Sequence, residues 1–331
     1  MSEDAQSPFA GARPSVGGVV ITYHPDAEFE TRLAAMARQV ATMLVVDNSA
    51  TESVRPELAS IAMRAGCRFI AHAHNLGIAA ALNGALAELE HQGFDWAVAF
   101  DQDSTPEDGC VSALVRLAAE CPRAAVVGSN WWDEARPAEP TRHLVHGSGF
   151  RPWFRRMSAT HDIGDVTFVI TSGSLIRLEA WRGVQGFSSE LFLDLVDTEF
   201  CLRAARNGWS VHLAAGARLR HRRGQKRPAR WCGHTWWPAQ IPPRRIRLIV
   251  RNRVWMLWRY GWRRWPWATF ELTHTAFMLF SALCLEEDKG PKLAAFFGGF
   301  SDAVRRRLGP PAWAKEPVTP TSVSASRTTP S

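Results

Sequence analysis

Short apolar runs alternate with helix-like segments in the first part of the chain, and this alternation restricts the fold more than any other feature. The runs GVVITY (18–23) and MLVVD (43–47) are short and β-branched and predict strands, and WAVAF (96–100) is fully apolar, which is typical of a strand buried on both faces. Between the first two, residues 28–41 have apolar side chains at helical spacing, and residues 77–91 predict another helix. Alternating strands and helices indicate an α/β fold with a mostly parallel sheet and flanking helices.

The remaining predicted elements lie on both sides of a loop-rich segment. Residues 131–165 are rich in Pro, Gly, Arg and Trp without a clear period, so they predict long loops. Further strands are predicted at 68–71, 124–128, 166–171 and 174–177, and further helices at 108–120, 197–207, 247–260 and 270–286. Ligands bind to such sheets at the carboxyl ends of the strands, so functional residues are expected there.

Asp101 and Asp103 give the sharpest local signal of chemistry. They directly follow the apolar run 96–100, so both carboxylates project from the end of a buried strand. Two neighbouring carboxylates repel each other unless a cation lies near them, and a divalent cation that bridges a diphosphate is the usual reason for such a pair. The alternative is a solvated, Asp-rich turn, but the position at a strand end favours a metal site.

Polar residues also follow the other early strands. Thr22, Tyr23 and His24 end the first strand, and Asp47 ends the second. A nucleotide site needs an acceptor for a base N–H, a flat side chain for stacking and polar groups for the ribose. Each of these residues taken alone is typical of a turn. The prediction of a nucleotide site therefore depends on their coincidence at one edge of the sheet.

The helix predicted after the third strand begins with Asn75 and Gly77, and Asn83 follows within it. Gly77 lets the backbone approach a ligand, and Asn75 could cap a helix whose N-terminus favours phosphate. A plain helix cap explains the same residues equally well.

Asp194, Asp197 and Glu199 form an acidic cluster around the start of the predicted helix 197–207. Asp197 lies in the first turn beside an apolar stripe, a position that can raise the pKa of a carboxyl toward the range of a general base. A first-turn acid that merely complements the helix dipole is the alternative. His221 lies between two arginines and would ordinarily be a solvated histidine in a basic loop.

The C-terminal third differs in charge from the rest of the chain. Residues 1–214 contain 17 Lys and Arg against 26 Asp and Glu, whereas residues 215–331 contain 22 against 6. Nine of the fifteen tryptophans lie in this basic third. The apolar stretch 272–285 is shorter than the ~20 residues of a membrane span, so it predicts an interfacial or core helix. Mixed Arg and Trp favour peripheral binding to an anionic membrane surface.

The pattern divides the chain into four segments. We expect a flexible N-terminus at 1–15, a nucleotide-binding α/β domain at 16–230, a basic, Trp-rich and membrane-associating helical extension at 231–310, and a disordered tail at 311–331. The cysteines form no Cys-x-x-Cys pair, and no apolar leader follows Met1. Both observations favour the cytoplasm, with the protein peripheral on the inner face of the cell membrane.

Seven segments, in this order, resemble the family 2 glycosyltransferases and their bacterial rhamnosyltransferase-like branch. They are VVITYHP, LVVDNS, NLGIAAALNGAL, FDQDS, TSGSLI, LFLDLVDTEFCLRAARNGW and the pair Arg251-Asn252. The resemblance implies a nucleotide-binding domain of the GT-A type. It also implies an enzyme that transfers a sugar from a nucleoside diphosphate donor with inversion at the anomeric carbon.

The resemblance also implies roles for individual residues. Asp197 matches the catalytic base. The nucleotide-binding residues would be Thr22, Tyr23, His24, Asp47 (base), Asn75, Gly77, Asn83 and Asp101 (ribose). The ligands of Mg²⁺ or Mn²⁺ would be Asp103, Asp101 and His221. The sugar-binding region would contain Ser172, Gly173, Asp194 and Glu199. Many relatives have Glu-Asp-x-Asp where this chain has Val196-Asp197-Thr198-Glu199, which leaves the role of Glu199 open.

The expected reaction transfers L-rhamnose from dTDP-L-rhamnose to a hydroxyl of a growing, lipid-linked cell-surface glycan. Another UDP- or dTDP-linked sugar is the alternative donor. A nucleic-acid-binding protein is the main rival, because a basic tail with tryptophans could bind phosphates and stack bases. It leaves the acidic strand ends unexplained, so no nucleic acid partner is expected. A nucleotidyltransferase would need a Gly-rich phosphate loop, which we do not find, and a scaffold with a decayed site is countered by the intact carboxylates.

Overall fold

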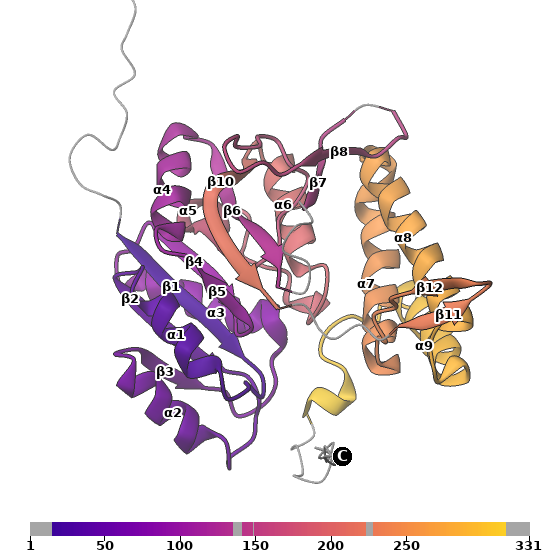
Figure 1. Cartoon of the computed structure of the whole chain (residues 1–331), viewed down its shortest axis with the longest axis horizontal. Helices are drawn as coiled ribbons and strands as arrows, with labels where there is room; N and C mark the ends of the chain where they lie inside the picture. The colour runs from indigo at the N-terminus through magenta and orange to yellow at the C-terminus, as the bar shows by residue number, and fades with distance from the viewer. Residues whose placement is uncertain (1–14, 135–140, 148, 223–227, 316–331) are drawn as a thin grey trace, which may run out of the picture.

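An eight-stranded sheet with helices on both faces forms the larger part of the molecule (Figure 1). The structure is a computed structural model that describes residues 15–134, 141–147, 149–222 and 228–315. Residues 1–14 of the predicted flexible N-terminus and 316–331 of the predicted tail therefore lie outside the described residues.

The sheet is mixed, with strand order β3-β2-β1-β4-β9-β6-β10-β5. Strands β3, β2, β1 and β4 are parallel, β9 runs antiparallel between β4 and β6, β10 is parallel to β6, and β5 is antiparallel to β10. The strands are β1 (Val16–Thr22), β2 (Thr42–Asp47), β3 (Arg68–Ala71), β4 (Trp96–Asp101), β5 (Ser104–Pro106), β6 (Ala124–Asp133), β9 (Ser174–Arg177) and β10 (Ser210–His221). The predicted α/β fold of the GT-A type is confirmed, with antiparallel strands added to the expected parallel set.

Two apolar cores lie on opposite faces of this sheet. The first contains side chains of α3 (Gly77–His91), α5 (Leu178–Gly183) and α6 (Val196–Arg206). The second contains side chains of α1 (Phe29–Ala37), α2 (Arg55–Arg64) and α4 (Cys110–Glu120). Strand β4 contributes to both, because successive side chains of a strand point to opposite faces: Ala97 and Ala99 enter the first core, and Val98 and Phe100 the second.

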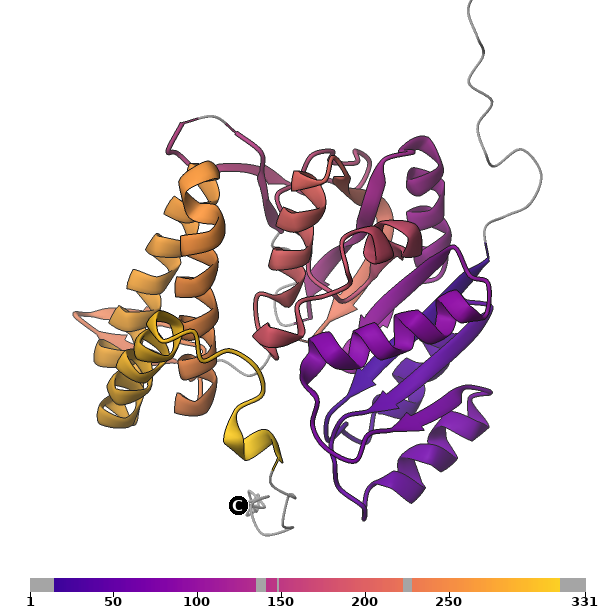
Figure 2. The same ribbon diagram turned by 180° about the vertical axis from the view of Figure 1, so that it is seen from behind.

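The basic third forms a helical region that packs beside the sheet (Figure 2). It contains α7 (Pro243–Tyr260), α8 (Trp265–Cys284) and α9 (Lys289–Val304), with short 3₁₀ turns at Gly261–Arg263 and Ala312–Lys315. Met256, Tyr260 and Trp267 are buried in the first core of the sheet domain. The helical region is therefore joined to the α/β domain by a continuous apolar core.

Two hairpins are associated with these helices. In the first, β7 (Arg142–Val145) pairs with β8 (Trp153–Arg156) and reaches from the sheet domain toward α8 (Figure 1). In the second, β11 (Ala229–Trp231) pairs with β12 (His234–Trp236), and the Trp236 ring lies 5.7 Å from that of Phe280 on α8.

Several predicted elements are wrong. Residues 166–171 do not form a strand; Val166 makes only an isolated bridge to Val145. The segment 131–165, predicted as long loops, contains the end of β6 and the β7–β8 hairpin. The strands of this hairpin are four residues long and form a separate two-stranded sheet. Such short strands give no clear periodicity in the sequence. The tail predicted from residue 311 begins instead with a 3₁₀ turn, because Trp313 and Ala314 pack against Phe192.

Helix α9 was not predicted, since Gly290, Pro291, Gly298 and Gly299 disfavour a helix by propensity. The structure gives a physical reason for one of them. A Cβ atom on Gly299 would collide with the backbone oxygen of Arg247 on α7. Close packing of α9 on α7 therefore compensates for the low helix propensity. Among the described residues, no helix combines the length and apolar content that crossing a bilayer requires.

Candidate active site

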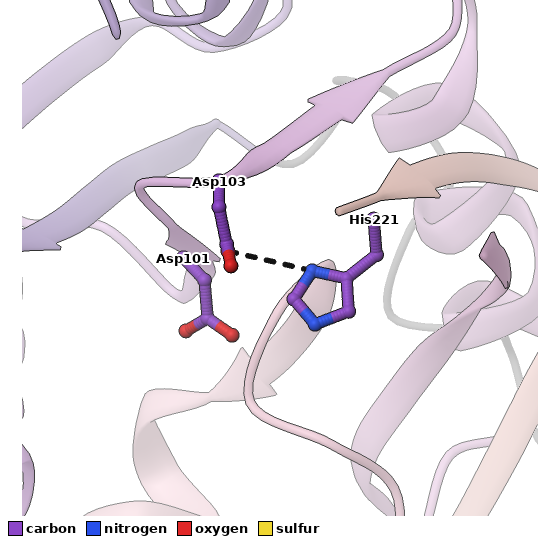
Figure 3. A group of neighbouring side chains, drawn as sticks. All are labelled: Asp101, Asp103 and His221. Carbon is purple, nitrogen blue, oxygen red and sulfur yellow. Dashed lines mark ion pairs between the residues drawn. The ribbon is translucent and has the colours of Figure 1, made fainter. Parts of the chain in front are cut away.

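Asp101, Asp103 and His221 form a cluster at one edge of the sheet (Figure 3). Asp101 ends β4, and Asp103 lies in the turn to β5. His221 ends β10 and pairs with Ser104 of β5, so it lies on a strand and not in the basic loop that the sequence suggests. One ligand atom from each residue lies within 4.8 Å of the others, and His221 Nδ1 lies 3.4 Å from Asp103 Oδ1.

Buried serines support this cluster from behind. The Ser172 hydroxyl accepts a hydrogen bond from the backbone N–H of Asp101 at 3.0 Å and donates one to the Ser104 hydroxyl at 2.7 Å. Ser104 Oγ lies 2.7 Å from His221 Nδ1. Gly173 has φ of +68°, and a Cβ atom there would collide with Ser129. Ser172 and Gly173, predicted to contact the sugar, thus form part of the wall behind the carboxylates.

The electrostatics of the cluster favour a bound cation. Burial raises the pKa of the Asp101 carboxyl to about 7; the Asp103 and Asp197 carboxylates act in the same direction, and Arg245 acts against them. A divalent cation would relieve this repulsion, and carboxylate oxygens with an imidazole nitrogen are suitable ligands for it. The three side chains therefore fit a metal site.

Asp197 lies at the start of α6 and lines the same cavity as Asp101 and His221. Its Oδ1 accepts hydrogen bonds from the backbone N–H of Thr198 at 2.7 Å and from the Thr198 hydroxyl at 3.3 Å. Burial raises the pKa of Asp197 to about 6, although the bonds from Thr198 act against this rise. Such a carboxylate is mostly ionised at neutral pH and accepts a proton more readily than an ordinary aspartate.

The loop that leads into α6 has an unusual backbone. Phe192, Asp194 and Leu195 all have φ near +60° (64°, 62° and 61°), a region that costs a residue with a side chain ~1–2 kcal/mol. The Asn252 side-chain amide on α7 donates hydrogen bonds to the carbonyl oxygens of Leu191 (2.9 Å), Leu193 (2.6 Å) and Asp194 (3.0 Å).

Arg251 supports the same loop from the adjacent position on α7. Its Nη2 donates to the Leu191 oxygen at 3.0 Å, and its Nη1 to the Gly309 oxygen at 2.8 Å. The Gly309 N–H donates in turn to the Glu190 oxygen at 2.7 Å. The Arg251-Asn252 pair thus links the helical region to the segment that positions Asp197.

A cavity of about 270 Å³ is lined by Asp101 and His221 of this cluster and by Asp197. Its polar wall also contains Asp194 and Arg245. The Arg245 guanidinium binds the Asp194 carboxylate through Nη2 at 2.7 Å and Nε at 3.1 Å. The sequence interpretation missed Arg245, because a single arginine in a basic segment has no distinguishing motif.

The predicted nucleotide-binding residues lie at the ends of β1 and β2. Asp47 is fully buried; its Oδ1 accepts the backbone N–H of Ser49 at 2.9 Å, and its Oδ2 lies 3.8 Å from Arg55 Nε. Asp47 Oδ2 has no hydrogen-bond partner among the described residues. The Thr22 hydroxyl is also buried and donates to the Val46 oxygen.

Tyr23 and His24 extend beyond the end of β1. The Tyr23 side chain is 44% exposed, so its ring is accessible for stacking. The Gln102 side chain bonds both the N–H and the carbonyl oxygen of Tyr23, at 2.7 and 3.1 Å. This amide therefore connects the predicted nucleotide site to the Asp101–Asp103 turn.

Asn75 and Gly77 lie where α3 begins. Asn75 Oδ1 accepts the N–H of Gly77 at 2.9 Å and the side-chain amide of Asn48 at 3.0 Å. Gly77 has φ of +78°, and a Cβ atom there would collide with Phe192. Asn83 lies farther along α3, where its side chain bonds both the N–H and the oxygen of Phe187 at 2.8 Å. Gly77 and Asn83 thus pack against the 187–192 segment.

Glu199, predicted in the sugar-binding region, is buried away from the cavity wall. Its carboxylate forms an ion pair with Arg203 at 2.7 Å and accepts the Tyr260 hydroxyl at 2.6 Å. Glu199 lies two residues after Asp197 and therefore points to another side of α6. Of the four residues predicted near the sugar, Asp194 lines the cavity.

Comparison with known sequences places these residues in a family. Residues 14–235 match the family described as glycosyltransferase like family 2. The chain belongs to this family. The predicted membership is therefore confirmed, and the match extends over the whole α/β domain and the residues of the cavity described above, apart from Arg245.

Two similar proteins are rhamnosyltransferases. The dTDP-rhamnosyl transferase RfbF of Shigella flexneri is 27% identical over 248 residues, which cover 73% of this chain and 80% of that protein. The N-acetylglucosaminyl-diphospho-decaprenol L-rhamnosyltransferase of Mycobacterium tuberculosis is 25% identical over 232 residues, covering 62% of this chain and 75% of that protein. This glycosyltransferase is thus similar to the rhamnosyltransferase-like branch of its family.

Solved structures of glycosyltransferases share the fold. S. aureus TarS has a TM-score of 0.56 at 12% identity, with coverage of 88% of this chain and 82% of that chain. The mannosyltransferase PcManGT from Pyrobaculum calidifontis, in complex with GDP-Man and Mn²⁺, has a TM-score of 0.52 at 14% identity, with coverage of 90% and 89%.

Replacement of Asn252 by Ala tests its role as a positioning residue. We expect the free energy of unfolding to fall by about 2–3 kcal/mol, because three carbonyl groups lose a buried donor. We also expect kcat for sugar transfer to fall at least tenfold, since the loop before Asp197 is no longer held. Urea denaturation and steady-state kinetics measure the two effects.

Leu117→Ala on α4 serves as the control. It removes a buried side chain at a distance from the loop and should cost roughly 2–5 kcal/mol, while kcat stays unchanged. If both variants had the same kcat, Asn252 would contribute to stability alone.

Proposed function

We propose that this glycosyltransferase transfers a sugar from a nucleoside diphosphate donor with inversion, with dTDP-L-rhamnose as the first donor candidate. The acceptor is a hydroxyl of a growing, lipid-linked cell-surface glycan. The observation that supports this best is the single cavity that contains both the Asp101–His221 cluster and the Asp197 carboxylate. One end can bind a diphosphate through a metal ion, and the other can accept a proton.

Direct displacement requires a base that faces the attacking hydroxyl. Asp197 accepts the proton of that hydroxyl as its oxygen attacks the anomeric carbon, and its raised pKa suits the task. Asp101, Asp103 and His221 would hold Mg²⁺ or Mn²⁺, which supplies positive charge beside the donor diphosphate. Arg245 adds a fixed positive charge on the same wall of the cavity. No glycosyl-enzyme intermediate is required.

The nucleotide extends from the metal cluster toward β1 and β2 in this proposal. Asp47 Oδ2 has no hydrogen-bond partner among the described residues and would accept a base N–H if its buried surroundings opened, and the exposed Tyr23 ring can stack. Thr22, His24, Asn75, Gly77 and Asn83 complete or support this end of the site. The names of the two rhamnosyltransferase relatives favour dTDP-L-rhamnose, and the Mn²⁺ in the similar mannosyltransferase structure supports a divalent cation. Another UDP- or dTDP-sugar is the alternative.

A panel of nucleotide sugars tests the donor. With Mg²⁺ or Mn²⁺, dTDP-L-rhamnose should raise the melting temperature by about 5 °C at a concentration roughly a hundredfold above its Kd. UDP-glucose and GDP-mannose should raise it less. Asp103→Ala should remove the metal-dependent part of the shift, whereas Asp108→Ala, an exposed aspartate at the start of the α4 region, should retain it. A shift with GDP-mannose alone would contradict the proposed donor.

Asp197→Asn keeps the shape of the side chain and removes the base. Donor and metal binding should persist, while kcat for transfer should fall by roughly 10² to 10⁴, the usual contribution of a general base. If Asp197 were only a first-turn acid, the variant would lose ~0.3–1 kcal/mol of stability and keep its turnover. Melting temperature and turnover of the same variant distinguish the two roles, and near-normal turnover would direct the search for the base to Asp194.

The helical region supports a peripheral membrane location on the inner face of the cell membrane. Trp258, Trp262 and Phe297 are each about 60% exposed (61%, 59% and 62%), and arginines lie beside the first two. Aromatic rings with neighbouring cations suit the headgroup layer of an anionic membrane.

Vesicle sedimentation tests this location. The protein should bind vesicles that contain phosphatidylglycerol and bind less to pure phosphatidylcholine, and Trp258→Ala with Trp262→Ala should weaken binding several-fold. Trp153→Ala, which removes an exposed tryptophan on the β7–β8 hairpin, is the matched control. Tight, salt-sensitive binding to an oligonucleotide without vesicle binding would favour the nucleic-acid alternative instead.

A further inference from the structure

A second cavity, of about 410 Å³, lies between the sheet domain, the β7–β8 hairpin and α8. It shares Trp131, Ile170 and Leu195 with the cavity that contains Asp197. Thr198, the residue after Asp197, also lines it. The two cavities are therefore neighbours that share a wall, and the second one reaches the residue next to the proposed base.

Aromatic side chains form much of its wall. Phe154 on β8 and Phe168 lie with their ring centroids 5.8 and 6.2 Å from that of Phe270 on α8. Trp131 at the end of β6 adds a fourth aromatic residue at the shared wall. Such a wall offers flat apolar surfaces to a ligand that itself has apolar faces.

Charged groups lie on the same wall. The Arg253 side chain on α7 is buried, and its Nε binds Glu271 on α8 at 2.7 Å, while its Nη1 donates to the Thr275 hydroxyl at 3.1 Å. These two bonds use two of the five N–H groups of the guanidinium. The remaining N–H groups can donate to a ligand with oxygen acceptors in the cavity.

Two further polar residues on the wall are His143, which is neutral, and Arg142, which is accessible. Burial lowers the pKa of His143 to about 4, so this imidazole is neutral near pH 7, and its Nε2 lies 2.9 Å from the Thr141 hydroxyl. The exposed Arg142 lies beside it on β7. Aromatic faces combined with a few fixed polar groups are suited to a sugar ring, which has apolar C–H faces and a polar edge of hydroxyl groups.

We infer that this cavity binds the saccharide ring of the acceptor that presents its hydroxyl to Asp197. The inference rests on the proposed glycosyltransfer, and it adds the location and the chemical class of the group bound there. An isoprenoid or acyl chain would contact the aromatic wall equally well, but it offers no oxygen acceptors to the guanidinium groups of Arg142 and Arg253 on the same wall. The lipid part of a lipid-linked acceptor therefore lies outside this cavity.

The test uses Phe154→Ala, because Phe154 is 47% exposed and its removal should leave the fold intact. The acceptor probes are the methyl glycosides of L-rhamnose, N-acetylglucosamine and galactose. Loss of one aromatic contact should raise the KM or Kd of the glycoside that binds best by roughly 3- to 10-fold. Metal-dependent donor binding and slow donor hydrolysis without acceptor should not change. Phe300→Ala on α9, which is similarly exposed (51%) and is not part of the cavity wall, should change none of these quantities.

Each contrary result has a distinct meaning. An unchanged acceptor constant in Phe154→Ala, or no binding of any of the methyl glycosides at tens of millimolar while the donor binds normally, overturns the inference and leaves the proposed function intact. If Phe154→Ala weakened decyl glycosides but not methyl glycosides, the cavity would bind a lipid chain and the saccharide assignment would be wrong. If the wild-type protein neither bound nor hydrolysed any nucleotide sugar, the proposed function itself would fail.

Discussion

The active site depends on the hydrogen bonds between the Asn252 amide and three carbonyl groups of the loop 191–194. This loop has left-handed backbone at residues other than glycine, which an isolated chain would avoid. The amide and the neighbouring Arg251 guanidinium compensate for that cost by pairing buried oxygens. As a result, the orientation of Asp197 is determined by a helix that follows it by more than forty residues.

The same dependence explains why the basic third is part of the candidate active site. Met256, Tyr260 and Trp267 lie in the core that also contains α3 and α6, and Tyr260 binds the buried Glu199. Helices α7 and α8 also form one wall of the larger cavity. A single set of helices thus stabilises the Asp197 loop, borders the inferred acceptor cavity and exposes the tryptophans expected at the membrane surface.

The sequence predicts the position of a site residue correctly where an apolar run ends at a sheet edge. Asp47 and Asp101 were correctly placed at strand ends, because apolar runs identify buried strands and the next polar residue must then emerge at the edge. The sequence does not predict whether a polar side chain contacts a ligand or the protein interior, because side-chain packing decides this. Ser172 and Glu199 were expected near the sugar, yet each is buried with protein partners, and the pattern of neighbouring residues does not distinguish a ligand contact from a buried support.

The sequence by itself determined the α/β class, the family and the positions of the acidic motifs, since all three depend on local periodicity and residue order. The resemblance to the family had named His221 as a metal ligand with Asp101 and Asp103, and the structure places the three side chains together. The tertiary structure alone decided that Arg245 faces Asp194 and that the β7–β8 hairpin encloses a cavity against α8. These arrangements bring together residues up to about 120 positions apart in the chain, as in the pairing of Ser104 with His221. Pairings over such separations arise from strand register and helix packing, which no short segment of sequence encodes.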